Sequence, residues 1–121
     1  MIAATALLCL SLNIYHESRG ESERVQEAVA AITMNRVERM EGPNSVCNVV
    51  YSSHQFTWTK NKRSKVKDKE ALSKAKKIAS AYLHGKINKQ VGKRVYFNHK
   101  RMGKRYRTPN KPIVLGQLVF Y

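Results

Sequence analysis

Two glutamates, Glu17 and Glu21, stand four residues apart near the end of a strongly apolar N-terminal segment. Burying a carboxyl group disfavours its charged form and raises its pKa, as a general acid working near neutral pH requires. Such an acid suits the protonation of a poor leaving group, for example a glycosidic oxygen. A glutamate at a helix end is also compatible with plain exposure to solvent, and the two residues alone leave both interpretations open.

The remaining acids give no obvious second catalytic group. They are expected on helices or in a turn, at Glu23, Glu27, Glu38, Glu41, Asp68 and Glu70. Aromatic residues could contribute to substrate binding, because their rings can form a wall on which sugars stack. The candidates are Tyr15, Phe56, Trp58 and Tyr96.

Helical patterns dominate the elements that must position these residues. Apolar spacing, capping residues and glycines predict helices over residues 3–18, 22–38, a short stretch after Ser45, and 68–84. Residues 55–59 are β-leaning and are expected to form a short strand or an extended active-site loop. Residues 95–97 and 114–121 look extended. We therefore expect one domain over residues 1–121, of mainly helical α+β class with a small β element.

Charge is divided unevenly along the chain, whose net charge is +15. Residues 1–59 carry four Lys/Arg against six Asp/Glu, whereas residues 60–121 carry nineteen against two. A polyanionic partner is expected for such a surface, and nucleic acid, anionic lipid and cell-wall polymer all qualify. A nucleic-acid-binding module without enzymatic activity is thus the main alternative to a glycosidase, although no nucleic-acid-binding motif supports it. A membrane-active basic domain is a third possibility.

The cysteines and histidines offer no metal site. Cys9 and Cys47 stand singly among apolar neighbours and are expected to be small buried hydrophobes rather than a bridge. The four histidines are scattered, so neither a metal nor another cofactor is expected. The apolar residues 1–12 are too short to span a bilayer and lack the basic start of a secretory signal, which favours a buried helix.

A family resemblance sharpens these expectations. The segment Glu17-Ser18-Arg19-Gly20-Glu21 resembles the Glu-Ala-Arg-Gly-Glu signature that opens the catalytic domain of spore-cortex lytic enzymes and related cell-wall hydrolases, with serine in place of alanine. Further similar blocks follow in the expected order, at residues 28–30 and 35–37, 46–51, 55–58, 96–98 and 116–120. The similarity therefore covers nearly the whole chain.

The resemblance implies a lysozyme-like fold and cleavage of the peptidoglycan bond between N-acetylmuramic acid and N-acetylglucosamine. Its first motif glutamate, Glu17, would be the catalytic acid, and Glu21 would serve in catalysis or in positioning the substrate. The resemblance also carries over a set of substrate-binding residues, to which Trp58 is added for its ring: Asn35, Gln55, Phe56, Trp58, Tyr96 and Asn98. A single acid/base suffices for lytic transglycosylase chemistry, which we favour over hydrolysis.

The chain is close to a bare catalytic domain, and this architecture fits a phage endolysin better than a spore enzyme. Such a protein would be made in the host cytoplasm and act at the bacterial cell wall. Its partners would be peptidoglycan glycan strands, together with anionic envelope polymers or lipids bound by the basic C-terminal half. We expect a monomer that binds no specific nucleic acid.

Overall fold

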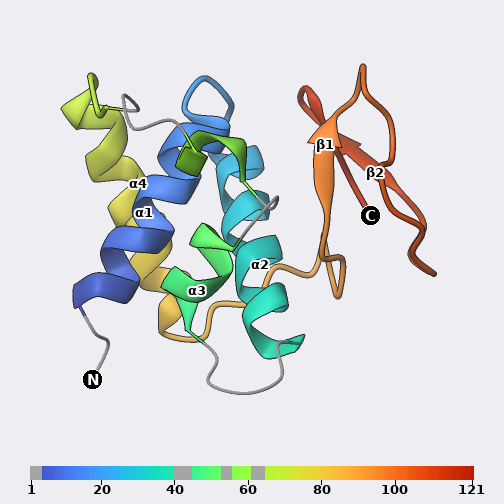
Figure 1. Ribbon diagram of the computed structural model, residues 1–121, viewed down its shortest axis with the longest axis horizontal. Helices are drawn as coiled ribbons and strands as arrows, with labels where there is room; N and C mark the ends of the chain where they lie inside the picture. Colours follow the sequence, from blue (N-terminus) through green and yellow to red (C-terminus); the bar gives the residue numbers. More distant parts are fainter. Residues whose placement is uncertain (1–3, 40–44, 53–55, 61–64) are drawn as a thin grey trace.

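Helices form one side of the molecule and a small sheet forms the other (Figure 1). The computed structural model describes residues 4–39, 45–52, 56–60 and 65–121. Within them the elements are α1 (Ala4–Ser18), α2 (Glu23–Arg39), α3 (Val46–Tyr51), the 3-10 helix η1 (Thr57–Lys60), α4 (Lys69–Leu83), β1 (Phe97–His99), β2 (Ile113–Leu115) and β3 (Leu118–Phe120). The structure confirms the prediction of a mainly helical α+β chain.

The first helix, α1, lies at the centre of the helical part and contacts α2, α3 and α4. Leu10 and Ile14 on it are fully buried, as its apolar sequence predicts. Its buried Ser18 hydroxyl donates a hydrogen bond to the Ile14 carbonyl, so this polar group is satisfied within the helix. The helix ends at Ser18 and carries Glu17 in its last turn.

A disulfide between Cys9 and Cys47 joins α1 to α3. The expectation that these cysteines are separate buried hydrophobes is therefore wrong. Thirty-eight residues separate them in the sequence, and only the packing of α3 on α1 brings their Cα atoms to 5.3 Å. A cross-link of this kind removes conformational freedom from the unfolded chain and so stabilises the folded one.

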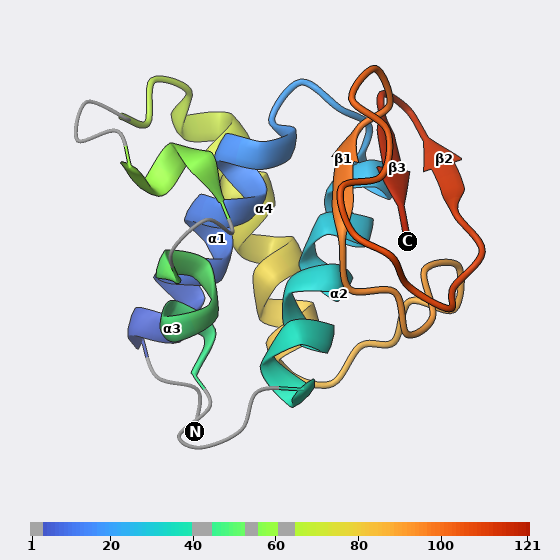
Figure 2. The same cartoon turned by 45° about the vertical axis from the view of Figure 1, so that its right-hand side comes forward.

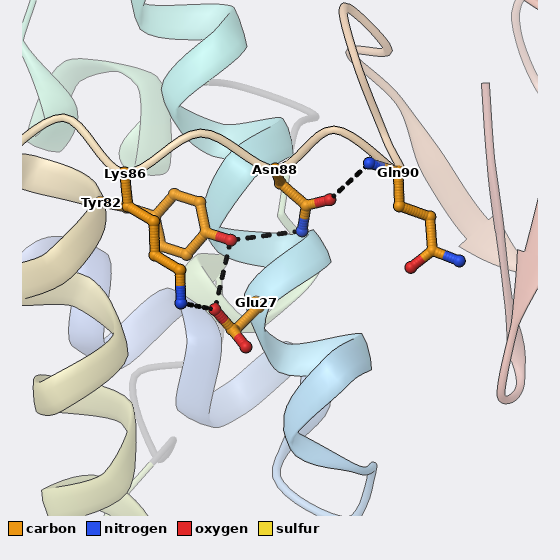
Figure 3. A network of polar contacts seen from close by, with 5 residues as sticks. All are labelled: Glu27, Tyr82, Lys86, Asn88 and Gln90. Carbon is orange, nitrogen blue, oxygen red and sulfur yellow. Dashed lines mark hydrogen bonds and ion pairs between the residues drawn. The ribbon is translucent and has the colours of Figure 1, made fainter.

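A polar network joins α2, α4 and the segment that follows α4 (Figure 3). Glu27 on α2 forms an ion pair with Lys86 and accepts a hydrogen bond from the Tyr82 hydroxyl at 3.3 Å. Asn88 donates to that hydroxyl at 3.2 Å and accepts from the Gln90 amide at 3.0 Å. The network fixes the path of the chain as it leaves α4 for the sheet.

The three strands form an antiparallel sheet in the order β1-β3-β2. α2 runs between the other helices and this sheet in both views (Figure 2). Phe120 at the centre is paired with Phe97 on one side and Ile113 on the other. Gly116 forms the tight turn between β2 and β3 with φ +58°, a conformation that side chains rarely adopt.

The strand predictions were less accurate than the helix predictions. Residues 114–121 hold two strands and a turn rather than one extended segment, and β1 starts at Phe97. A short strand or an extended loop was expected over residues 55–59, but residues 57–60 form a 3-10 helix, and Gln55 lies outside the described residues. Among the helices that the structure describes, none is long and apolar enough to cross a membrane. The described residues also hold no cluster of potential metal ligands.

Candidate active site

Glu17 is largely buried at the end of α1, and burial raises the pKa of its carboxyl from 4.5 to about 7. The positive charge of Arg36 acts in the opposite direction and limits that rise. Lys86 and Glu27 form the one ion pair found between described residues, so Arg36 acts on Glu17 without direct salt-bridge contact. A pKa raised toward neutrality suits a group that both gives and accepts a proton.

Arg36 is held between two aromatic rings. Its guanidinium carbon lies 5.1 Å from the ring centre of Phe56 and 4.9 Å from that of Tyr96. Its Nε donates to the Val95 carbonyl at 2.5 Å, whereas its buried Nη1 has no hydrogen-bond partner in the described part of the chain. This arrangement keeps a cation near Glu17 in a poorly hydrated place, where its field is strong.

Arg36 was not among the predicted site residues, although the sequence held a signal for it. The apolar stripe of α2 passes through Val25, Val29 and Ile32, and Arg36 continues it one turn later. A charged residue on the buried face of a helix needs a partner or a function.

Three tyrosines extend the site on the side of the sheet. The rings of Tyr96 and Tyr106 stack with their centres 4.4 Å apart, and the ring of Tyr121 lies 5.8 Å from Tyr96. The fully buried Tyr121 hydroxyl accepts hydrogen bonds from Asn98 Nδ2 at 2.8 Å and the Arg105 amide at 2.6 Å. Tyr106 and Tyr121 were not predicted, because their roles depend on how the chain returns to the sheet.

Trp58 lies against the last turns of α1. Its ring stacks on that of His16 at 4.4 Å, and its Nε1 donates to Asn13 Oδ1 at 2.8 Å. Tyr51 packs edge-on at 5.7 Å. The predicted residue Trp58 thus stands next to the helix end that carries Glu17, and a buried asparagine fixes its orientation.

The other predicted substrate-binding residues make contacts within the protein. Phe56 is buried, with its ring against Arg36. Asn35 donates to the carbonyls of Gly92 and Arg94, both at 2.8 Å, and Asn98 donates to the Gly103 carbonyl at 3.0 Å. These side chains hold the segments around the site in place.

Glu21 lies in the loop after α1, away from the helix that carries Glu17. Its Oε1 accepts a hydrogen bond from the Gln117 amide at 3.0 Å, in the turn between β2 and β3. The turn comes so close that a Cβ on Gly116 would stand 2.8 Å from Glu21 Oε2. Glu21 therefore ties the sheet to the helical part next to the site.

Comparison with known proteins identifies the family of the chain. Residues 20–121 match the family model of cell wall hydrolases. The chain belongs to this family. The match includes Glu21 and the predicted substrate-binding residues, while Glu17 lies three residues before its start.

Two curated relatives are similar over a short stretch. Both are spore cortex-lytic enzymes of Bacillus cereus, one of them from a named strain, and each is 46% identical over 44 residues. That stretch is 36% of this chain and 17% of each relative, so the chain spans only a small part of their length. No solved structure matches this cell wall hydrolase.

Proposed function

We propose that this cell wall hydrolase degrades peptidoglycan by cleaving the bond between N-acetylmuramic acid and N-acetylglucosamine, with Glu17 as general acid and base. The observation that carries the proposal is the largely buried Glu17 carboxyl, whose pKa is raised to about 7 beside the fixed cation of Arg36. The family match and the spore cortex-lytic relatives support a wall substrate.

In the proposed reaction, protonated Glu17 gives its proton to the glycosidic oxygen. The bond from that oxygen to C1 of the muramic acid breaks, and the leaving N-acetylglucosamine keeps the proton as a hydroxyl. Glu17 is then a carboxylate, which the nearby charge of Arg36 stabilises. Positive charge develops on the muramic acid ring as the bond breaks, and the Glu17 carboxylate stabilises that charge as well.

We favour lytic transglycosylase chemistry for the second half of the reaction. The C6 hydroxyl of the muramic acid attacks C1 and returns its proton to Glu17, which leaves a 1,6-anhydro end and restores the acid. An inverting hydrolase would instead need a second carboxylate about 6.5–9.5 Å away to activate water. The carboxylate nearest to Glu17 in the sequence is that of Glu21. Its Oε1 accepts a hydrogen bond from the Gln117 amide, which argues against Glu21 as the base of an inverting hydrolase.

We further propose that the protein is a phage endolysin, made in the host cytoplasm and acting at the bacterial wall. The Cys9–Cys47 disulfide supports action outside the cytoplasm, because such bonds persist in oxidising compartments. The extended glycan strand would be its main partner, and the protein would act as a monomer.

Mass spectrometry of soluble products tests this function. Purified peptidoglycan is incubated with the wild type, with Glu17→Gln, and with Glu23→Gln as a control at an exposed glutamate. Release of muropeptides by the wild type and the control alone is expected, with 1,6-anhydromuramic acid ends. Reducing ends without the anhydro form would contradict the transglycosylase step. Normal release by folded Glu17→Gln would remove Glu17 from the mechanism.

A nucleic-acid-binding module remains the second candidate, since residues 60–121 carry nineteen basic residues against two acids. Nonspecific attraction to a polyanion weakens steeply as salt rises. Tight, sequence-selective binding at moderate salt, together with no release of muropeptides, would favour this candidate over the glycosidase.

A further inference from the structure

The segment between β1 and β2 is a dense basic loop. We call residues 100–111 the basic loop; its six cations are Lys100, Arg101, Lys104, Arg105, Arg107 and Lys111, and it contains no acid. All six are exposed, and none forms an ion pair with any residue that the structure describes. The last acid before the loop is Glu70, so no neighbour in the sequence offsets this charge.

Hydrogen bonds hold the backbone of the basic loop, including one from the Arg94 guanidinium to the Lys111 carbonyl at 2.7 Å. The Tyr121 hydroxyl accepts from the amides of Arg105 and Tyr106, and Asn98 donates to the Gly103 carbonyl. At one end of the loop the Lys100 amide donates to the Gln117 carbonyl at 2.8 Å. The loop thus presents its charges from a fixed frame, which lowers the entropy cost of binding a ligand.

A ladder of cations and rings connects the basic loop to the candidate active site. The Arg105 guanidinium lies 5.8 Å from the ring centre of Tyr106, which stacks on Tyr96 at 4.4 Å. Arg36 follows at 4.9 Å from Tyr96, and its charge reaches Glu17. Three successive contacts between cations and rings thus link the basic loop to Arg36, the cation that acts on Glu17.

We infer that the basic loop binds a phosphodiester polymer attached to the peptidoglycan, and so selects glycan strands that carry such polymers. The inference rests on the proposed function, since it places the polymer and the scissile bond on one substrate. Three of the cations are arginines, whose planar guanidinium groups match phosphate oxygens. Six cations within twelve residues suit a repeating anion better than the scattered carboxylates of stem peptides.

Three side chains of the loop can be neutralised without touching the ladder. Lys100→Gln, Lys104→Gln and Arg107→Gln are combined in one variant, because these three side chains are exposed and form no ion pair with the described residues. The matched control neutralises three exposed lysines of α4, at Lys74, Lys76 and Lys77. Both variants lose the same net charge, so a difference between them reports position.

Cleavage is compared on two forms of one peptidoglycan, with its phosphodiester polymers retained or removed by hydrofluoric acid. The wild type and the α4 variant should cleave the polymer-bearing form faster, and the loop variant should lose most of that preference. In parallel, calorimetry with the released polymer should show affinity falling by roughly tenfold or more in the loop variant alone. Both arms are run at physiological salt.

Three results would overturn the inference. Equal loss in the loop and α4 variants would mean bulk charge attraction, and no loss in either would mean no polymer site in the loop. A preference that survives hydrofluoric acid but disappears when stem peptides are removed would assign the loop to peptide carboxylates. If no protein cleaves either substrate, the proposed function fails, while the calorimetry still decides whether the loop binds the polymer.

Discussion

The last turn of α1 and the loop that follows it each hold one glutamate, four residues apart, in opposite surroundings. Glu17 is largely buried, and its pKa is raised to about 7, with Arg36 acting from a distance. Glu21 accepts a hydrogen bond from the backbone of the β2–β3 turn and fills the space beside Gly116. The same residue type thus has a raised pKa, suited to the proposed proton transfer, in one place and holds the sheet by a hydrogen bond in the other.

The largest expected effect is on activity in Glu17→Gln. Removing a general acid costs about 10²- to 10⁴-fold in rate, so muropeptide release should fall by that range while the fold is kept. Release rates measure the loss of activity, and circular dichroism of the purified variant checks that the fold is kept. An equal loss of activity in folded Glu21→Gln would contradict the contrast between the two glutamates, because Glu21 would then be a second catalytic carboxylate.

The pH dependence should follow the ionisation of Glu17. Since the acid must be protonated to start the reaction, kcat/KM should fall as pH rises through about 7. Replacing Arg36 by Met should move this fall to higher pH, because Arg36 stabilises the carboxylate; Arg36→Lys should stay closer to the wild type. A pH profile identical in the Met variant would show that Arg36 does not tune Glu17.

The effect of Glu17→Gln on stability should have the opposite sign to its effect on activity. The pKa of Glu17 is higher in the folded protein than its ordinary value of 4.5, so its contribution is fully present below pH 4.5 and is lost as pH rises through about 7. Glu17→Gln should therefore stabilise the protein by up to about 3 kcal/mol at pH 8 and have little effect at pH 4. Urea unfolding at both pH values checks this.

Glu21 should matter through structure. Glu21→Ala removes the acceptor of the Gln117 amide and should lower the free energy of unfolding by about 1–2 kcal/mol, whereas Glu21→Gln keeps an acceptor oxygen and should cost less. Denaturant unfolding of the two variants provides the measurement. Equal destabilisation would show that the negative charge, rather than the hydrogen bond, holds the turn.

Gly116→Ala tests the other side of the same contact, with an expected cost of about 1 kcal/mol. Its positive φ is unfavourable for a residue with a Cβ, and that atom would come within 2.8 Å of Glu21. Part of this cost should disappear in Glu21→Ala, where the side chain that would clash is shorter. Thermal unfolding of the single and double variants shows whether the two effects are coupled.

The helices could be predicted because their signals are local. The Asp68 N-cap and the short helix after Ser45 are confirmed, and α1, α2 and α4 begin and end within about one residue of the expected positions. Glu17 also lies where the apolar segment predicted it, at the end of a buried helix. Periodicity and capping carry this information in neighbouring residues.

The remaining features depend on contacts between distant segments. The spacing of Cys9 and Cys47 gives no hint of their disulfide, and Tyr121 acquires its role only when the last strand returns beside β1. The hydrogen bonds that Asn35 and Asn98 donate to the backbone could not be predicted for the same reason, because the sequence did not place the segments that accept them. For Arg36 the sequence shows only that a charged residue continues the apolar stripe of α2; its neighbours Phe56 and Tyr96 are known only from the structure.

In the basic loop, the groups that fix the backbone differ from the side chains that carry the charge. Because the Tyr121 hydroxyl, Asn98 and backbone groups set the path of residues 100–106, most of the charged side chains are free to vary without a cost in folding. Under the polymer-binding role inferred for the loop, replacing Lys104 or Arg107 would direct the enzyme to walls that carry different polymers. An engineer could use it in the same way, exchanging outer residues to redirect the enzyme while leaving its melting temperature nearly unchanged.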